Sequence, residues 1–227
     1  MKIVAVVPSA GRGIRLKSRI PKPLVLLDSH PILIHTLKNL SSSKFIDNIV
    51  LVVDKSYLDK FKSAVKDYNL KKIKKIIPGG RQRFDSVLNG LLACDSDADL
   101  ILIHDGVRPF ITQRIIKDAI DAARKKGASV VAVPVKSTIK EAKASKLLVK
   151  RTLDRNILWE IQTPQVFKRD IILNAYKRNK NSFVFDDACL VEKLGKDVKI
   201  VQGNYENIKI TTPEDLLFAK VLLKKKV

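Results

Sequence analysis

Residues 1–13, MKIVAVVPSAGRG, decide the fold, because the apolar run 3–7 passes directly into a turn of small residues. A buried strand followed by glycine is typical of a parallel α/β sheet, in which ligands bind at the carboxyl ends of the strands. The alternation of short β-branched runs with amphipathic segments then continues along the chain. The further runs lie at 49–53, 73–77, 100–103 and 130–135, with helical patterns near 31–41, 56–68, 84–94 and 112–127. This order predicts an α/β fold with a doubly wound, mostly parallel sheet and right-handed crossovers.

The alternation changes after residue 135. Segments 138–142 and 148–154 read as two strands around a polar turn at 143–146, which predicts a hairpin arm that need not pack on the main sheet. Helical patterns return at 169–180 and 187–194. A strand follows at 198–202, then a short stretch at 207–210 and a last helix from Pro213. We predict one domain over residues 1–227, with the arm at about 136–156.

Composition narrows the function to partners that carry negative charge. The 227 residues have a formal net charge of +21, which favours an anionic partner. Lysine runs such as 71–75 and 224–226 lack the interleaved aromatic side chains that a single-stranded nucleic-acid platform uses, so a nucleic-acid partner is disfavoured. The two cysteines, Cys94 and Cys189, stand alone, which disfavours a metal knuckle or a disulfide framework. The first apolar run is too short for a secretory signal and no run reaches transmembrane length, so we predict a cytoplasmic protein.

The loop after the first apolar run is the first candidate site. Pro8-Ser9-Ala10-Gly11-Arg12-Gly13 is followed by Arg15, Lys17, Arg19 and Lys22. Small residues let the backbone approach a ligand, and backbone N–H groups beside cations suit a triphosphate. Leu16 stands where a dinucleotide fingerprint has its third glycine, and no Walker lysine follows, so the loop fits neither pattern.

Two further clusters end later strands. The first is Gly79-Gly80-Arg81-Gln82-Arg83-Phe84-Asp85-Ser86, and the second is His104-Asp105-Gly106-Val107-Arg108-Pro109. Asp85 or Ser86 can serve simply as the cap of the helix that follows. Asp105, at the end of a strand and beside Arg108, is a candidate contact for Mg²⁺ or for a ribose, although Asp–Arg pairs are more often structural.

These clusters and six later motifs together resemble one family. The later motifs are Val133-Pro134-Val135 with Thr138, Asp154-Arg155-Asn156, Leu158-Trp159, Thr163-Pro164-Gln165 with Phe167, Asp186-Asp187-Ala188, and Asn207-Ile208-Lys209-Ile210-Thr211. In order and spacing they resemble the 2-C-methyl-D-erythritol 4-phosphate cytidylyltransferase (IspD) family. The resemblance implies a Rossmann-like nucleotidyltransferase domain and a homodimer whose arm reaches the partner subunit. It also implies transfer of CMP from CTP to 2-C-methyl-D-erythritol 4-phosphate, with release of pyrophosphate, in the non-mevalonate route to isoprenoid precursors.

The resemblance also assigns roles residue by residue. The catalytic residues would be Arg15, Lys22, Arg155 and Lys209. CTP would be bound by Ser9, Ala10, Gly11, Gly13, Gly80, Ser86 and Asp105. The polyol phosphate would be bound by Asp105, Arg108, Thr138, Arg155 and Lys209. The implied cofactor is Mg²⁺ or another divalent cation, held mainly by the CTP phosphates, with Asp105 as the candidate protein ligand.

Two alternatives stay open. Gly106-Val107 replaces the usual pair of alanines before Arg108, and Val107 is similar to the related ribitol-phosphate cytidylyltransferases, so ribitol 5-phosphate or another polyol phosphate is the first. The second, more remote, is a basic nucleic-acid-binding protein, suggested only by the net charge.

Overall fold

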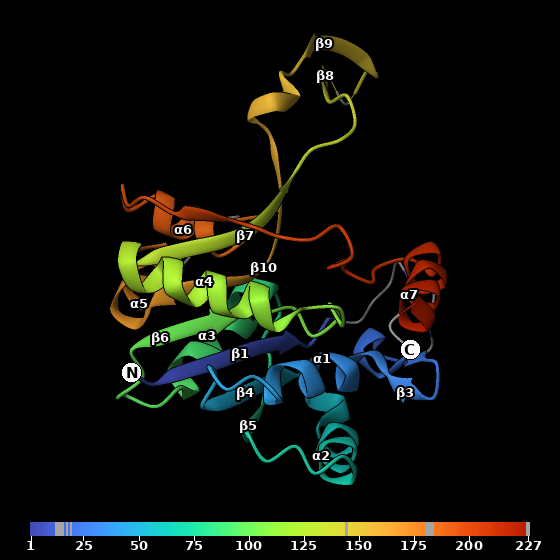
Figure 1. Cartoon of the computed structure of the whole chain (residues 1–227), viewed down its shortest axis with the longest axis vertical. Coiled ribbons are helices and arrows are strands. Elements are labelled where there is room, and N and C mark those ends of the chain that lie inside the picture. Colours follow the sequence, from blue (N-terminus) through green and yellow to red (C-terminus); the bar gives the residue numbers. More distant parts are fainter. Residues whose placement is uncertain (12–15, 17, 19, 144, 180–183, 226–227) are drawn as a thin grey trace.

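The computed structural model of this chain describes residues 1–11, 16, 18, 20–143, 145–179 and 184–225. Within this part of the chain lies a seven-stranded sheet in the order β11-β7-β10-β6-β1-β4-β5 (Figure 1). Its strands are β1 (Ile3–Ser9), β4 (Asn48–Val53), β5 (Ile73–Pro78), β6 (Leu100–Ile103), β7 (Ala128–Pro134), β10 (Trp159–Lys168) and β11 (Lys199–Gln202). Neighbours pair in parallel except β10, which is antiparallel to both β6 and β7. The predicted α/β fold with a mostly parallel sheet is confirmed.

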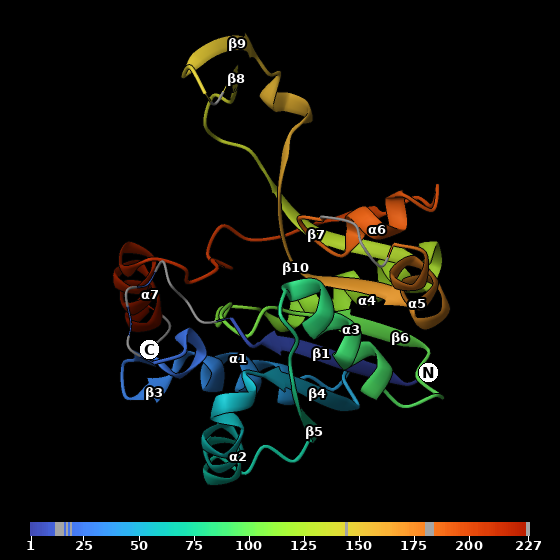
Figure 2. The ribbon, with the colours of Figure 1, turned by 180° about the vertical axis from the view of Figure 1, so that it is seen from behind.

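Helices cover both faces of the sheet (Figures 1 and 2). One face carries α1 (Ile32–Ser41), α2 (Leu58–Asp67) and α4 (Gln113–Lys126), and the other carries α3 (Arg83–Ala93), α5 (Arg169–Arg178) and α6 (Ala188–Glu192). The strands supply both cores, because successive side chains of a strand point to opposite faces. In β1, Ala5 and Val7 join the first core while Val4 and Val6 join the second. An almost continuous apolar run is therefore what a strand buried on both faces requires.

The expected helices and strands are present, with shifted bounds. Helix α4 buries the predicted face of Ile115, Ile116, Ala119, Ile120 and Ala123, and it ends at Gly127 with φ of 89°. The helix expected at 56–68 begins as a 3-10 turn, η3 (Lys55–Tyr57), which Asp54 caps before α2. The strand expected at 130–135 is shifted to 128–134, and the described structure has no strand at 207–210.

Strand β10 was missed from the sequence. Its segment contains Pro164, which lacks a backbone donor and argues against a central strand, and a mainly polar stretch over 162–165. The structure accommodates Pro164 through a shift in the register of β10 against β7 between Ile161 and Gln165. Since β10 lies between β6 and β7, it brings the Thr163 segment beside the end of β6.

A second, two-stranded sheet lies away from the main one. Strands β8 (Lys140–Lys143) and β9 (Leu148–Thr152) pair antiparallel and extend beyond the ends of β7 and β10 (Figures 1 and 2). The 3-10 turn η4 (Arg155–Ile157) follows them. Large apolar side chains here face solvent in the single chain, and Leu147 and Ile157 are 87% and 75% exposed. That this arm joins two subunits stays a prediction.

A third apolar cluster supports the loops at the carboxyl ends of the strands. It packs Leu27 of the short strand β2 (Leu26–Leu27), Ile32 at the start of α1 and the last helix α7 (Pro213–Lys225) against Val107, Phe110 and Ile210. Strand β2 pairs antiparallel with β3 (His30–Pro31). The backbone N–H of Ile210 donates to the carbonyl of Val107 at 3.0 Å. This bond ties the loop after β6 to the segment that carries Lys209.

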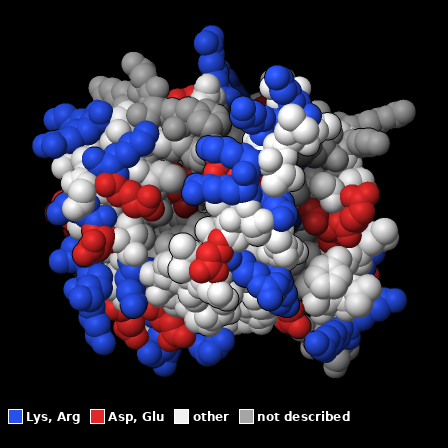
Figure 3. All heavy atoms as spheres, turned by 90° about the horizontal axis from the view of Figure 1, so that it is seen from above, with Lys and Arg blue, Asp and Glu red and all other residues white. Residues whose placement is uncertain are grey.

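Positive charge is spread over the surface. Seen from above, Lys and Arg side chains form several separate groups, with acidic side chains between them (Figure 3). No helix in the described part of the chain combines the length and the apolar character needed to cross a membrane.

Gly90 allows α3 to pack closely on the sheet. A Cβ atom at this position would lie 2.4 Å from Cγ1 of Val6 and 3.1 Å from Cγ2 of Val52. We expect Gly90→Ala to lower the free energy of unfolding by about 1–3 kcal/mol, because neither β-branched core side chain can yield freely. Thermal or denaturant unfolding measures this change. Leu92→Ala, at an exposed position of the same helix, is the control, and a Gly90→Ala protein as stable as the parent would contradict the packing argument.

Candidate active site

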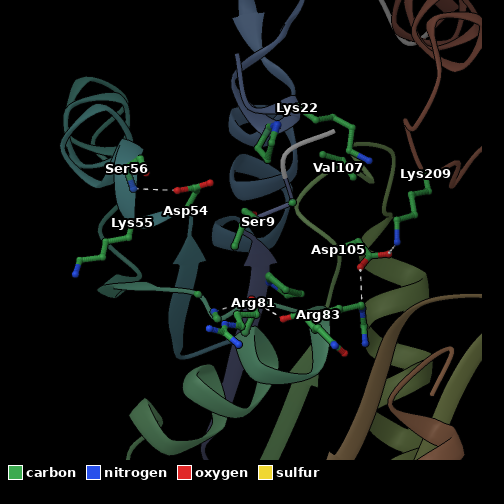
Figure 4. Close-up of a pocket in the computed structure, with 18 residues that line it drawn as sticks. Ser9, Lys22, Asp54, Lys55, Ser56, Arg81, Arg83, Asp105, Val107 and Lys209 are labelled. Atoms are coloured by element: carbon green, nitrogen blue, oxygen red, sulfur yellow. Dashed lines mark hydrogen bonds and ion pairs between the residues drawn. The ribbon is translucent and has the colours of Figure 1, made fainter. Parts of the chain in front are cut away.

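A cavity of about 930 Å³ opens at the carboxyl ends of β1, β4, β5 and β6 (Figure 4). Its lining comes from the three loop clusters of the sequence, together with the segments after β4 and before α7. The lining residues are Pro8, Ser9, Ala10, Gly11, Lys22, Pro23, Asp54, Lys55, Ser56, Gly79, Gly80, Arg81, Gln82, Arg83, Ser86, Asp105, Val107 and Lys209. The sequence places these groups far apart, and the parallel sheet brings them to one edge.

Glycines let two of the loops meet. A Cβ atom on Gly79 would lie 2.5 Å from Cβ of Ala10 and 2.7 Å from Oγ of Ser86, so a side chain here would push the first two loops apart. The Ser86 hydroxyl accepts from the backbone N–H of Gly80 at 3.1 Å and donates to the carbonyl of Gln82 at 3.1 Å. Helix α3 is capped by Gln82 and by Asp85, which confirms the capping interpretation for Asp85. The backbone at this wall of the cavity is therefore held firmly.

Asp105 sits among three cations. One carboxylate oxygen lies 2.9 Å from Nζ of Lys209 and 3.4 Å from Nε of Arg108, and the other lies 3.8 Å from Nε of Arg83. Burial by itself raises the pKa of this carboxyl group, but the three cations outweigh burial and hold the pKa far below its usual range. Asp105 is therefore ionised throughout the working pH range, and it fixes the positions of the cations around it.

His104 clamps the loop that carries Asp105. Its ring lies 3.1 Å from the carbonyl of Arg108 through Nε2 and 3.1 Å from Oγ1 of Thr163 through Nδ1. A carbonyl only accepts, so Nε2 carries the proton and Nδ1 accepts from the Thr163 hydroxyl, which in turn accepts from the backbone N–H of Asp105 at 3.1 Å. Because the ring is fully buried, its pKa falls to about 4. His104 is thus a neutral structural residue.

This clamp predicts a loss of stability in mild acid. The unfolded chain protonates His104 near pH 6.5 and the folded chain only near pH 4, so folding is opposed by about 1.4 kcal/mol per pH unit as the pH falls between these values. Above pH 6.5 the ring is neutral in both the folded and the unfolded chain, so His104 adds no pH dependence to the free energy of unfolding. Denaturant unfolding at several pH values should show this slope, and His104→Asn should reduce it. An unchanged slope in the variant would show that His104 is not the titrating group.

Arg83 is a lining residue that the sequence did not single out. Its guanidinium donates to both oxygens of Asp187, at 2.8 and 2.6 Å, while its Nε faces Asp105. Arg83 belonged to a quoted cluster and Asp187 to a quoted motif, but the sequence offered no signal that residues 104 apart would pair.

The predicted site residues divide into three groups. The cavity lining includes Ser9, Ala10, Gly11, Lys22, Gly80, Ser86, Asp105 and Lys209, and Arg108 lies directly behind Asp105. Gly13 and Arg15 lie outside the described residues. Thr138 and Arg155 lie on the arm, are exposed, and do not line this cavity, and Arg155 donates to the carbonyl of Lys136 at 2.9 Å.

The carboxylates of the described residues determine whether the protein alone could hold a metal ion. Across the residues that the structure describes, no group of three or more His, Cys, Asp or Glu side chains could hold a metal ion. Asp105 already meets three cations, so a metal ion here would have to displace one of them. Mg²⁺ commonly needs only one or two carboxylates when substrate phosphates supply the other ligands. The cavity therefore fits a metal carried by a nucleotide better than a metal held by the protein alone.

Comparison with known proteins identifies the family. A family model described as 2-C-methyl-D-erythritol 4-phosphate cytidylyltransferase (IspD) matches residues 3–225. The chain belongs to this family. A cytidylyltransferase of that name from Syntrophus aciditrophicus is 45% identical over 227 residues, which cover 99% of this chain and 97% of that protein. The cytidylyltransferase of the same name from Halalkalibacterium halodurans is 41% identical, with 100% and 99% covered.

Solved structures agree with this assignment. The crystal structure of 4-diphosphocytidyl-2C-methyl-D-erythritol synthase from Anaerococcus prevotii matches with a TM-score of 0.86 at 34% identity and 98% of both chains covered. The 2-C-methyl-D-erythritol 4-phosphate cytidylyltransferase from Thermus thermophilus matches with a TM-score of 0.80 at 27% identity. The cytidylyltransferase fold thus covers nearly the whole chain.

Proposed function

We propose that this chain transfers CMP from CTP to 2-C-methyl-D-erythritol 4-phosphate, giving 4-diphosphocytidyl-2-C-methyl-D-erythritol and pyrophosphate in the non-mevalonate route to isoprenoid precursors. Membership of the family over residues 3–225 supports the reaction class. The observation that carries the proposal is the cavity at the strand ends, which Lys22 and Lys209 line together with two glycine-containing loops.

The proposed chemistry needs positioning and charge, without a general base. A phosphate monoester has a second pKa of about 6, so at neutral pH it is already a nucleophile. Its attack on the α-phosphorus of CTP breaks the bond to pyrophosphate, and the charge that develops on the phosphoryl oxygens is stabilised by fixed cations. Lys22 and Lys209 are the described cavity residues to which we assign this role, together with Arg15. His104 has no part in it, because its ring is buried and both nitrogens are engaged.

For CTP we propose a cradle of backbone and small side chains. Ser9 ends β1, Ala10 and Gly11 follow it, and these residues line the cavity together with Gly80 and Ser86. Gly79 brings the two loops together, because its Cβ position lies beside Ala10 and Ser86. Such close walls favour a pyrimidine over a larger purine. We assign Gly13 to the same cradle. Bound Mg²⁺, or another divalent cation, would be held mainly by the CTP phosphates and would neutralise the leaving pyrophosphate.

For the polyol phosphate we propose a site shared by two subunits. Lys209, Asp105 and Arg108 lie at the cavity of one chain, whereas Thr138 and Arg155 lie on its arm. A homodimer in which each arm reaches the neighbouring cavity would complete the set, and the exposed apolar side chains of the arm support this arrangement.

We also infer that the reaction takes place in the cytoplasm. Cys94 and Cys189 are both free thiols, as expected in a reducing compartment.

A substrate panel tests the function. Purified protein with Mg²⁺ and CTP should release pyrophosphate in a coupled assay with 2-C-methyl-D-erythritol 4-phosphate, and more slowly with ribitol 5-phosphate. Faster turnover of ribitol 5-phosphate, the substrate that Val107 brings into consideration, would reassign the polyol. No turnover with any polyol phosphate would refute the proposal. Tight nucleic-acid binding that weakens steeply with salt would instead support the binding-protein alternative.

A further inference from the structure

Three charged side chains form a partition between two cavities. Arg83, Asp105 and Lys209 line the 930 Å³ cavity, and the same three residues line a second cavity of about 440 Å³ on the side of β10 and α6. Their spacing brings Arg83 Nε to one oxygen of Asp105 and Lys209 Nζ to the other (Figure 4). The side chain of Lys209 is 36% exposed and lines both cavities.

Arg83 is anchored from behind. Its two terminal nitrogens form a fork on the carboxylate of Asp187, whose side chain is only 1% exposed. Asp187 is itself fixed, because it accepts from the Tyr176 hydroxyl at 2.6 Å and its backbone N–H donates to Oε1 of Gln165 at 3.1 Å. A planar guanidinium held by both terminal nitrogens has its Nε direction set as well.

We propose that Arg83, held by Asp187, is a positioning residue that orients the Asp105 carboxylate and thereby holds Lys209 at the phosphate of the second substrate. With one oxygen of Asp105 facing Arg83, the other is turned toward Lys209. Lys209 then stays at the cavity wall and does not sample other rotamers before the substrate arrives. This inference rests on the proposed function, since Lys209 acts on the polyol phosphate only if that reaction takes place.

An effect of net charge and an effect of positioning predict opposite changes in the use of the polyol phosphate by the Asp187→Asn protein. This substitution removes a negative charge near the site while keeping the shape of the side chain. If only net charge mattered, an anionic substrate would bind more tightly. If positioning matters, the guanidinium loses its fork, the carboxylate of Asp105 loses its fixed orientation, and the polyol phosphate is used less well.

The test is steady-state kinetics with each substrate varied in turn. We expect Asp187→Asn to lower kcat/KM for the polyol phosphate by about 10- to 100-fold, with KM for CTP changed much less. Glu192→Gln is the matched control, because Glu192 lies on α6 and lines the second cavity, whereas the guanidinium is held by Asp187. It removes the same charge and leaves Gln165 with its bonds to residues 186–188, so it should leave kcat/KM for the polyol phosphate near the parent value.

Arg83→Lys provides the second variant. It keeps the positive charge but cannot form the fork, so we expect a loss similar to that of Asp187→Asn. A merely structural brace between α3 and α6 would lower the melting temperature of these variants without a selective effect on one substrate. Circular dichroism and thermal unfolding confirm folding, and should Asp187→Asn not fold, Arg83→Lys decides alone.

The outcomes separate the two proposals. Parent protein that fails to turn over CTP with any polyol phosphate refutes the proposed function, and the positioning role falls with it. An active parent whose Asp187→Asn and Arg83→Lys variants keep kcat/KM for the polyol phosphate, or improve it, overturns the positioning role alone. Equal losses in Glu192→Gln and Asp187→Asn would also overturn it, because the effect would then follow charge.

Discussion

The Lys22→Ala protein is expected to turn over CTP and 2-C-methyl-D-erythritol 4-phosphate roughly 10²- to 10³-fold more slowly than the parent, the scale seen when one preorganised charge-stabilising group is lost. Lys22 lines the cavity and is only 9% exposed. Lys22 begins the 3-10 turn η2 (Lys22–Leu24) and lies between Pro21 and Pro23. The two pyrrolidine rings restrict the backbone on either side of it. The backbone that carries Lys22 is therefore restricted before the substrates bind.

The loss should appear mainly in kcat. A group that meets charge developing in the transition state contributes less to binding of the ground state. Single-turnover measurements with saturating CTP give the rate of the chemical step directly. Lys196→Ala removes the same charge from an exposed position outside the cavity and should leave the rate unchanged. A chemical step of parent speed in Lys22→Ala would remove this residue from the catalytic set.

Mixing two inactive variants is expected to restore activity. If Arg155 acts in the cavity of the partner subunit, a dimer of one Lys22→Ala chain and one Arg155→Ala chain carries both lesions at one site and none at the other. Random pairing then makes roughly a quarter of all sites intact, as twofold symmetry requires. The observation behind this prediction is that Arg155 lies on the arm and does not line the cavity of its own chain.

The matched control uses two lesions in one cavity. Lys22 and Lys209 line the same cavity of a single chain, so a dimer of Lys22→Ala and Lys209→Ala chains has one lesion in each site. That mixture should stay inactive, provided that exchange of subunits is verified by differently tagged chains. Absence of recovery with Arg155→Ala, in mixtures shown to contain mixed dimers, would place Arg155 in its own subunit's site.

Much of the fold could be predicted because periodicity reports burial. Helix α4 kept its predicted buried face, and β1, β4, β5 and β6 appeared close to the expected positions. Strand β10 did not, because its central residues are polar and include Pro164. Those polar side chains are satisfied by contacts distant in sequence, such as Thr163 with His104 and Gln165 with Asp186. The local pattern of apolar and polar residues does not indicate hydrogen-bond partners that are distant in sequence.

The site could be predicted in part for the same reason. Its loops directly follow strands of a parallel sheet, so the sequence predicts that Lys22, Gly80 and Asp105 lie at the edge formed by the carboxyl ends of the strands. The role of Arg83 depends on Asp187, which precedes α6, and the partner of His104 Nδ1 is Thr163, 59 residues away in sequence. Such pairings form between segments that are distant in sequence, so they become apparent only in the tertiary structure.

The attachment of the arm has an evolutionary consequence. The chain leaves the sheet from β7 and returns through β10, and at this junction the N–H of Val135 donates to the carbonyl of Leu158 at 3.1 Å. Because the two ends of the inserted segment are neighbours, the segment can change in length without altering the register of β7 and β10. The segment between Thr138 and Arg155 can therefore vary in length while the loops that line the cavity keep their geometry.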